Sequence, residues 1–75
     1  MKHYNEIFSV TIKEGYTMFA LVSDGDLWHA IIRRDKMQDW VFCYAYDIES
    51  GTWGQGHYCK IYAEAAAELA KHISF

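Results

Sequence analysis

The chain has no proline, only two cysteines and no uninterrupted apolar run longer than seven residues. With 52% of its residues hydrophobic and 23% charged, its composition is typical of a folded globular chain and not of a disordered segment or linker. The longest apolar run, 40–46, is far shorter than the roughly 20 residues that span a bilayer. The first residues also lack the apolar core of a signal peptide. We therefore expect a cytoplasmic protein without a membrane segment.

Basic residues are also few, since seven Lys and Arg stand against ten Asp and Glu and give a formal net charge of −3. Nucleic-acid binding depends on neutralising phosphates with Lys and Arg, so this balance argues against a nucleic-acid partner. At 75 residues the chain has the size of one domain, and no repeat or linker divides it. We expect a single domain over residues 1–75.

The two cysteines, Cys43 and Cys59, match neither a zinc motif nor a CxxC redox motif. In a reducing compartment both are expected to be free thiols, although one strand register would place them opposite each other and allow a disulfide. Two alternatives use the same residues: His57 and Cys59 near Asp47 as a small Cys/His-dependent enzyme, or both cysteines with His57 and His29 as metal ligands. The scattered spacing favours neither, and we expect no catalytic residue, no metal and no cofactor.

Alternating or apolar segments separated by turn residues predict four or five β-strands. They lie at 6–13, 16–22, 27–34, 40–47 and from 52 onward. Asp24-Gly25 is a strong hairpin signal because both residues tolerate positive φ, and Ser50-Gly51 predicts another tight turn. Strands joined by such short turns predict an antiparallel sheet in meander order.

The last predicted element is an amphipathic helix over 62–73. Its apolar positions recur at helical spacing, at Tyr62, Ala65, Ala66, Leu69, Ala70 and Ile73. The outer face carries Glu64, Glu68, Lys71 and His72. No good N-cap residue precedes the helix. The predicted fold is therefore α+β, an antiparallel sheet with one C-terminal α-helix packed on one face.

The stretch GTWGQGHYC, 51–59, combines three glycines with a tryptophan. If Ser50-Gly51 forms a two-residue hairpin, alternate side chains divide between the two faces of the sheet. One face then carries Trp40, Phe42, Tyr44, Tyr46, Trp53, Gln55 and His57. The other face carries Val41, Cys43, Ala45, Gly54, Gly56 and Tyr58. We expect Gly54 and Gly56 to let the Ala-rich helix approach this smaller face; a phosphate-binding loop is disfavoured because no helix begins directly after them.

The aromatic face is the candidate functional site. Tyr and Trp are the usual anchors of protein interfaces, and we predict a small non-catalytic protein-binding module that binds its partner with five residues of this face. These binding residues are Trp40, Tyr44, Tyr46, Trp53 and His57. Two alternatives remain open: burial of the face as core, in a curled sheet with Phe8, Phe19 and Trp28, or burial in a homo-oligomer that makes the protein a self-assembling structural module. Loss of binding by a folded Trp53→Ala variant is expected if the face binds a partner.

The run YAYDIESGTWGQGHY, 44–58, and the helix start after it resemble short uncharacterised proteins of phages and mobile elements in gut bacteria. The resemblance covers Tyr44 to about Leu69 and rests on the Tyr-Asp turn, the GTWGQGHY segment and the helix. It attaches no activity to these residues. Small accessory proteins of that kind often bind and inhibit a host protein, including CRISPR effectors, so the resemblance implies a partner protein from the host.

Overall fold

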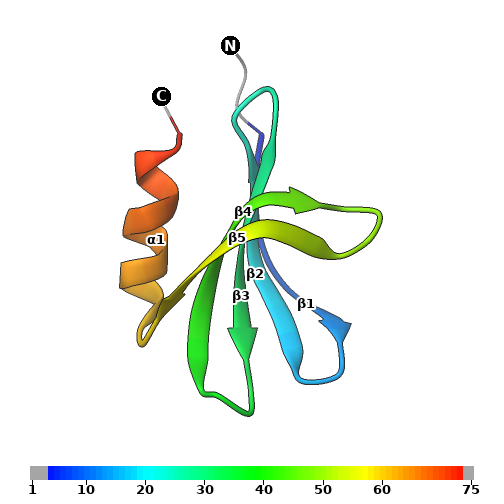
Figure 1. Ribbon diagram of the computed structural model, residues 1–75, viewed down its shortest axis with the longest axis vertical. Helices are drawn as coiled ribbons and strands as arrows, with labels where there is room; N and C mark the ends of the chain where they lie inside the picture. Colours follow the sequence, from blue (N-terminus) through cyan, green and yellow to red (C-terminus); the bar gives the residue numbers. More distant parts are fainter. Residues whose placement is uncertain (1–3, 74–75) are drawn as a thin grey trace.

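A computed structural model describes residues 4–73, with side chains described from Ile12 onward. The elements are β1 (Tyr4–Lys13), β2 (Tyr16–Ser23), β3 (Trp28–Arg34), β4 (Asp39–Asp47), β5 (Thr52–Cys59) and α1 (Tyr62–Lys71). The strands form one antiparallel sheet in the order β1-β2-β3-β4-β5, and α1 packs on one face of it (Figure 1). The predicted α+β fold, a meander sheet with one C-terminal helix, is confirmed.

The hairpin between β4 and β5 has a longer loop than the sequence predicts. Asp47 pairs with Thr52, so the loop consists of residues 48–51, and the Gly51 N–H donates to the Asp47 carbonyl at 2.8 Å. The predicted two-residue loop is therefore wrong, and Phe42 lies opposite His57. A shift of two residues keeps every side chain on the same side of a strand. Most of the predicted division between the two faces therefore holds.

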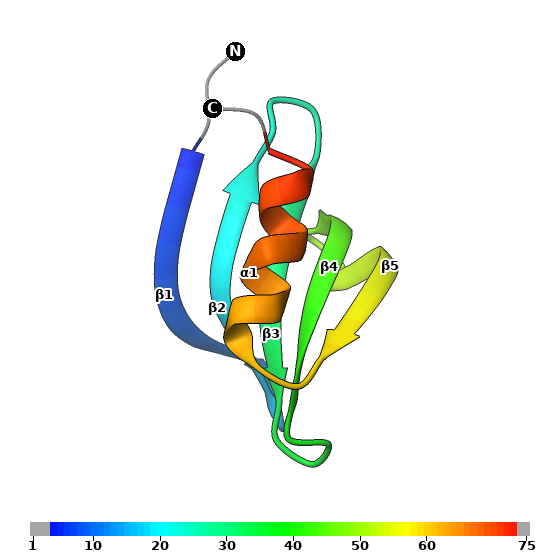
Figure 2. The same cartoon turned by 90° about the vertical axis from the view of Figure 1, so that its left-hand side faces the viewer.

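The helix packs on the aromatic side of the sheet and not on the glycine side, so that prediction is wrong. Figure 2 shows α1 in front of the sheet, and it contacts β3, β4 and β5. Ala65 is fully buried in a cluster with Ala20, Ile31, Phe42 and Cys59. Half-buried around this cluster are Trp40, Tyr44, Ala66 and Leu69. Small helix residues against large sheet residues bury more apolar area than a helix laid on glycines, which would leave the aromatic rings in water.

The aromatic face is thus covered by the helix, and the alternative in which it is core is correct for part of it. Phe42 is 2% exposed. The ring of Trp40 meets Tyr62 of the first helical turn and Phe19 of β2, both edge to face, at 5.1 and 4.9 Å between centroids. Phe8 belongs to β1, but its side chain lies outside the described part of the chain.

The opposite side of the sheet forms a second cluster because β4 and β5 bend. In Figure 1 the two strands turn sharply and cross over β2 and β1. Ala45 in β4 has a φ of 55°, in the left-handed region that L-residues rarely adopt. Beyond it, Tyr46 and Trp53 join the second cluster instead of continuing the aromatic face. The buried members of this cluster are Met18, Ala30, Ile32, Val41, Cys43 and Tyr46.

The glycines of β5 make room for aromatic rings and not for the helix. A Cβ on Gly56 would lie 3.0 Å from Nε1 of Trp53 and 3.2 Å from ring atoms of Tyr58. The Tyr58 ring is in turn held by Arg34, whose guanidinium lies 4.5 Å above it. A Cβ on Gly54 would find ordinary contacts at 3.6 and 3.7 Å. Gly56 alone of the two is therefore required for close packing.

Alanine at Gly56 is expected to destabilise the protein by about 1 kcal/mol relative to alanine at Gly54, because the added methyl group overpacks the Trp53 and Tyr58 rings. Gly54→Ala is the matched control: it lies in the same strand and removes the same backbone freedom without a clash. Chemical denaturation of both variants measures the difference, and the indole N–H resonance of Trp53 is expected to move only in Gly56→Ala. Equal stability of the two variants would contradict this packing.

Candidate functional site

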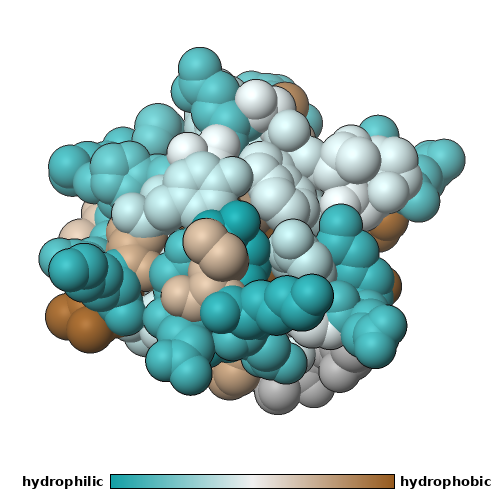
Figure 3. Space-filling model, turned by 60° about the horizontal axis from the view of Figure 1, so that its bottom comes forward, coloured by the Kyte–Doolittle hydropathy of each residue, from teal (hydrophilic) through white to brown (hydrophobic). Residues whose placement is uncertain are grey.

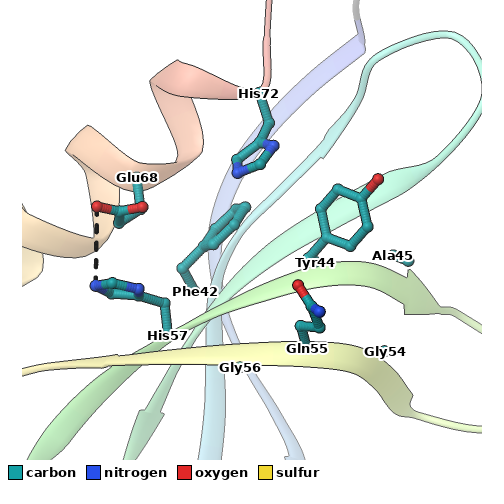
Figure 4. Close-up of a pocket in the computed structure, with 9 residues that line it drawn as sticks. All are labelled: Phe42, Tyr44, Ala45, Gly54, Gln55, Gly56, His57, Glu68 and His72. Carbon is teal, nitrogen blue, oxygen red and sulfur yellow. Dashed lines mark ion pairs between the residues drawn. The ribbon is translucent and has the colours of Figure 1, made fainter.

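An open groove lies between the C-terminal half of α1 and strands β4 and β5. Its volume is about 620 Å³. The side chains that shape it are Phe42, Tyr44, Gln55, His57, Glu68 and His72. Figure 4 shows these side chains converging from the helix and from the two strands. The groove is therefore built by the packing of the helix on the aromatic side of the sheet.

Aromatic rings form the inner wall of the groove. His72, the C-cap residue of α1, stacks on Phe42 at 5.2 Å with 16° between the ring planes. It also meets Tyr44 at 5.2 Å. His29 of β3 lies behind them, 5.1 Å from Tyr44 and 5.9 Å from Phe42. The wall is thus apolar in area but offers π faces and a phenol group to a ligand.

His29 is fully buried and its hydrogen bonds fix the bend of β4. Its Nδ1 accepts the backbone N–H of Ala45 at 3.3 Å, and its Nε2 lies 2.9 Å from Oδ2 of Asp24. Because Nδ1 accepts, the ring is neutral and Nε2–H donates to the carboxylate. The carboxylate of Asp24, through its Oδ1, also accepts the N–H groups of Asp26 and Leu27 at 2.9 and 2.8 Å. Asp24 of the β2–β3 turn therefore positions the imidazole of His29, and the imidazole in turn fixes the backbone of Ala45 through a hydrogen bond.

Glu68 supplies the negative charge of the groove. Its Oε2 accepts a hydrogen bond from Nζ of Lys71 at 3.0 Å and lies 3.8 Å from Nε2 of His57. These contacts keep the pKa of Glu68 below its ordinary value, with Lys71 as the main favourable cause and with contributions from His57 and His72. The carboxylate is therefore ionised at neutral pH. Figure 4 shows it facing His57 across the groove.

Strand β5 is an open edge of the sheet beside the groove. It pairs with β4 alone, and six of its eight residues are exposed. Edge strands are usually protected by proline, lysine or bulges. From Thr52 to Cys59 the strand contains neither residue, and its register with β4 is constant. The other edge, β1, shows two register irregularities. Residues 55–59 of β5, on one side of the bend opposite Ala45, thus present a regular row of backbone N–H and C=O groups next to the groove.

The five residues predicted to bind a partner do not form one surface. Tyr44 and His57 line the groove. Trp40 is half-buried under the first turn of α1. Tyr46 and Trp53 lie on the other side of the sheet, with their rings 6.4 Å apart. The prediction of one continuous aromatic face is wrong because the bend at residue 45 reverses the side that the following residues face.

The helical contribution to the groove was not predicted from the sequence. The helical pattern predicted Glu68 and His72 on the solvent face of the helix. In the structure they lie four residues apart on the side of α1 that faces β5, and both line the groove. The spacing was visible in the sequence. Whether this spacing directs the two side chains to solvent or to the sheet depends on which face of the sheet the helix covers.

The thiols are not activated as nucleophiles. Burial raises the pKa of Cys43 to about 12. Burial also raises the pKa of Cys59, and the carboxylates of Glu64, Glu68 and Asp39 add to the shift. Both cysteines are free, and they belong to the two different clusters on opposite sides of the sheet. The disulfide alternative is therefore wrong, and both thiols are protonated at neutral pH.

Among the described side chains, from Ile12 to Ile73, no group of three or more His, Cys, Asp or Glu is placed to hold a metal ion. None of the helices in the described part of the chain is both long and apolar enough to cross a membrane.

Comparison of the chain with protein-family models, curated proteins and solved structures finds no match. The groove and the open edge are thus the features on which a function can be based.

Proposed function

We propose that the protein is a non-catalytic protein-binding module that pairs an extended segment of a partner with strand β5. The observation that carries this proposal is the regular, unprotected β5 edge next to a groove. Strand addition of this kind takes affinity from main-chain hydrogen bonds and specificity from pockets for alternate side chains. Tyr44 and His57 of the predicted site contact the bound segment. Trp40, Tyr46 and Trp53 support the sheet that presents it.

The surface composition also favours main-chain recognition. On the face shown in Figure 3, hydrophobic areas are small and separated by hydrophilic ones. The exposed large hydrophobic residues of the described chain are spread over several elements: Leu27, Met37, Ile48, Tyr58, Ile61 and Tyr62. A large obligate interface is usually a continuous apolar patch. A short extended segment needs no such patch.

The resemblance of residues 44–69 to proteins of phages and mobile elements supports a host protein in the cytoplasm as the source of this segment. The resemblance includes all of β5 and most of α1, the two elements that border the groove. The chain carries a net charge of −3, which argues against a nucleic-acid partner, and the proposed partner is a protein segment and not a membrane.

Selection of a random heptapeptide library displayed on phage against the whole protein tests the proposal. We expect enriched peptides to slow hydrogen exchange at backbone amides of residues 55–59 of β5 and not in β1. In a synthetic peptide, N-methylation at alternate residues is expected to abolish binding, whereas N-methylation of the residues between them leaves it unchanged. The two sets are matched controls, because only alternate N–H groups of an added strand point toward its neighbour.

Three results would contradict the proposal. The first is a library without enriched peptides. The second is a bound peptide that tolerates N-methylation at every position, since its main chain then makes no ladder with β5. The third is concentration-dependent protection of the β5 amides in the protein alone, which would assign the edge to a second copy of the chain and favour the self-assembling structural module.

A further inference from the structure

The carboxylate of Glu68 has unused hydrogen-bonding capacity. Both of its contacts use Oε2, and among the described residues Oε1 makes no hydrogen bond or ion pair. The side chains of its two partners are largely exposed, at 68% for Lys71 and 58% for His57, whereas that of Glu68 is 22% exposed. Lys71 and His57 can therefore turn to solvent without loss of packing, while the carboxylate stays at the groove.

The surroundings of Glu68 also favour a cation. The groove lies beside the last turns of α1, where the helix dipole places its negative end. Phe42 is buried beneath the stacked ring of His72, so the half-buried ring of Tyr44 is the aromatic face of the wall that a ligand can reach, and aromatic faces attract cations. Gln55 of β5 adds an amide oxygen that makes no hydrogen bond with the part of the chain whose side chains are described, residues 12–73. The Glu68 carboxylate, the helix dipole and the aromatic ring all favour a positively charged ligand group.

We propose that the groove binds a basic side chain, with arginine preferred, of the segment paired with β5. This inference rests on the proposed function and specifies the chemistry of the partner. In an added strand every second side chain points to the helix side of the sheet. One such side chain lies between β5 and α1, where a planar guanidinium can stack on the ring of Tyr44 and bind the Glu68 carboxylate through two N–H groups.

Arginine is preferred over lysine because the groove has planar recognition elements. The guanidinium is delocalised, donates in a fixed fork and stacks on aromatic faces, whereas an ammonium group is more strongly hydrated. An acidic side chain in the same place is disfavoured by Glu68 and by the helix C-terminus. A neutral apolar side chain contacts the rings but leaves the carboxylate without a new partner.

The test uses the peptides enriched from the random heptapeptide library. We expect a basic residue at one fixed position, and its replacement by methionine is expected to weaken binding about tenfold. Glu68→Gln is expected to weaken binding of the arginine peptide about tenfold as well. In Glu68→Gln the same peptide substitution should cost less than about threefold, because the two changes remove one interaction. Glu14→Gln, an equal charge change in the β1–β2 turn, is expected to change affinity by less than about twofold.

The outcomes separate this inference from the function on which it rests. Peptides that bind along β5 without a conserved basic position would overturn the inference and leave the proposed function intact. So would additive effects of Glu68→Gln and the peptide substitution, since the basic residue then contacts another group. A library without enriched peptides would overturn both. Far-UV circular dichroism of Glu68→Gln confirms that the helix is retained.

Discussion

Leucine in place of Ala65 is expected to lower the free energy of unfolding by about 2 kcal/mol. Ala65 is 0% exposed and packs against Ala20, Ile31, Phe42 and Cys59. The larger side chain has no room unless α1 moves away from the sheet. Chemical denaturation measures the loss, and the resonances of Phe42 and His72 are expected to shift because their rings stack only while the helix is seated.

Ala67→Leu is the matched control for this prediction. Ala67 lies two residues further along the same helix and is exposed. Leucine and alanine both favour helix, so the control is expected to change stability by no more than about 0.5 kcal/mol. If both variants were as stable as the unchanged protein, the packing of α1 on the aromatic side of the sheet would be wrong, and the groove with it.

Asparagine in place of Asp24 is expected to destabilise the protein by about 2 kcal/mol, although the two side chains have nearly the same shape. The carboxylate accepts the Nε2–H of His29 and two backbone N–H groups of the β2–β3 turn. An amide has one oxygen, and its NH₂ group cannot accept the remaining donor. The other tautomer of His29 gives no relief, because its Nδ1–H would face the N–H of Ala45. In either orientation of the amide a donor therefore loses its acceptor: the buried Nε2–H of His29, or the N–H groups of Asp26 and Leu27.

Asp26→Asn makes the same charge change in the same loop at an exposed residue, and it is expected to be close to neutral. Equal effects of the two substitutions would show that the loop responds to charge and not to the hydrogen bonds of Asp24. Thermal unfolding, followed by circular dichroism, compares the two variants under the same conditions.

The same interaction has a defined pH dependence. The N–H of Leu27 is the largest cause that lowers the pKa of Asp24 below its ordinary value of 3.8, and His29 and the N–H of Asp26 contribute as well. A lowered pKa in the folded state stabilises the protein above the unfolded value, and this stabilisation is lost as the pH falls. The difference in stability between the unchanged protein and Asp24→Asn is therefore expected to be constant near neutral pH and to shrink below about pH 4.

The fold was predictable because local patterns determine it. Strands separated by turn residues and one amphipathic stripe lead to a meander sheet with a helix. The side on which the helix packs was not predictable from the glycines, since Gly54 and Gly56 fit two explanations equally well in sequence. The structure shows that Gly56 makes room for Trp53 and Tyr58. The buried apolar area explains the outcome, because the helix covers the side of the sheet with more apolar surface.

The candidate site was predictable only in part. Alternation correctly placed Tyr44 and His57 on one side of the sheet. It failed at Tyr46 because the left-handed Ala45 interrupts the alternation. No local signal marks Ala45 as such a residue, since alanine has no special preference for positive φ. Its conformation depends on a hydrogen bond to His29, which is 16 residues earlier in the chain.

The bend at Ala45 also sets a limit on what the open edge can hold. Residues 55–59 of β5 run beside α1 and the groove, whereas the part of the strand nearer Thr52 turns across the sheet (Figure 1). An added strand would have to bend at the same place to stay paired with all of β5, and a segment without such a bend pairs only with the straight part. The straight part of the edge therefore limits how long a paired segment can be. A segment of about five residues, at roughly 3.4 Å per residue, fills it, and a longer partner leaves the protein at the bend.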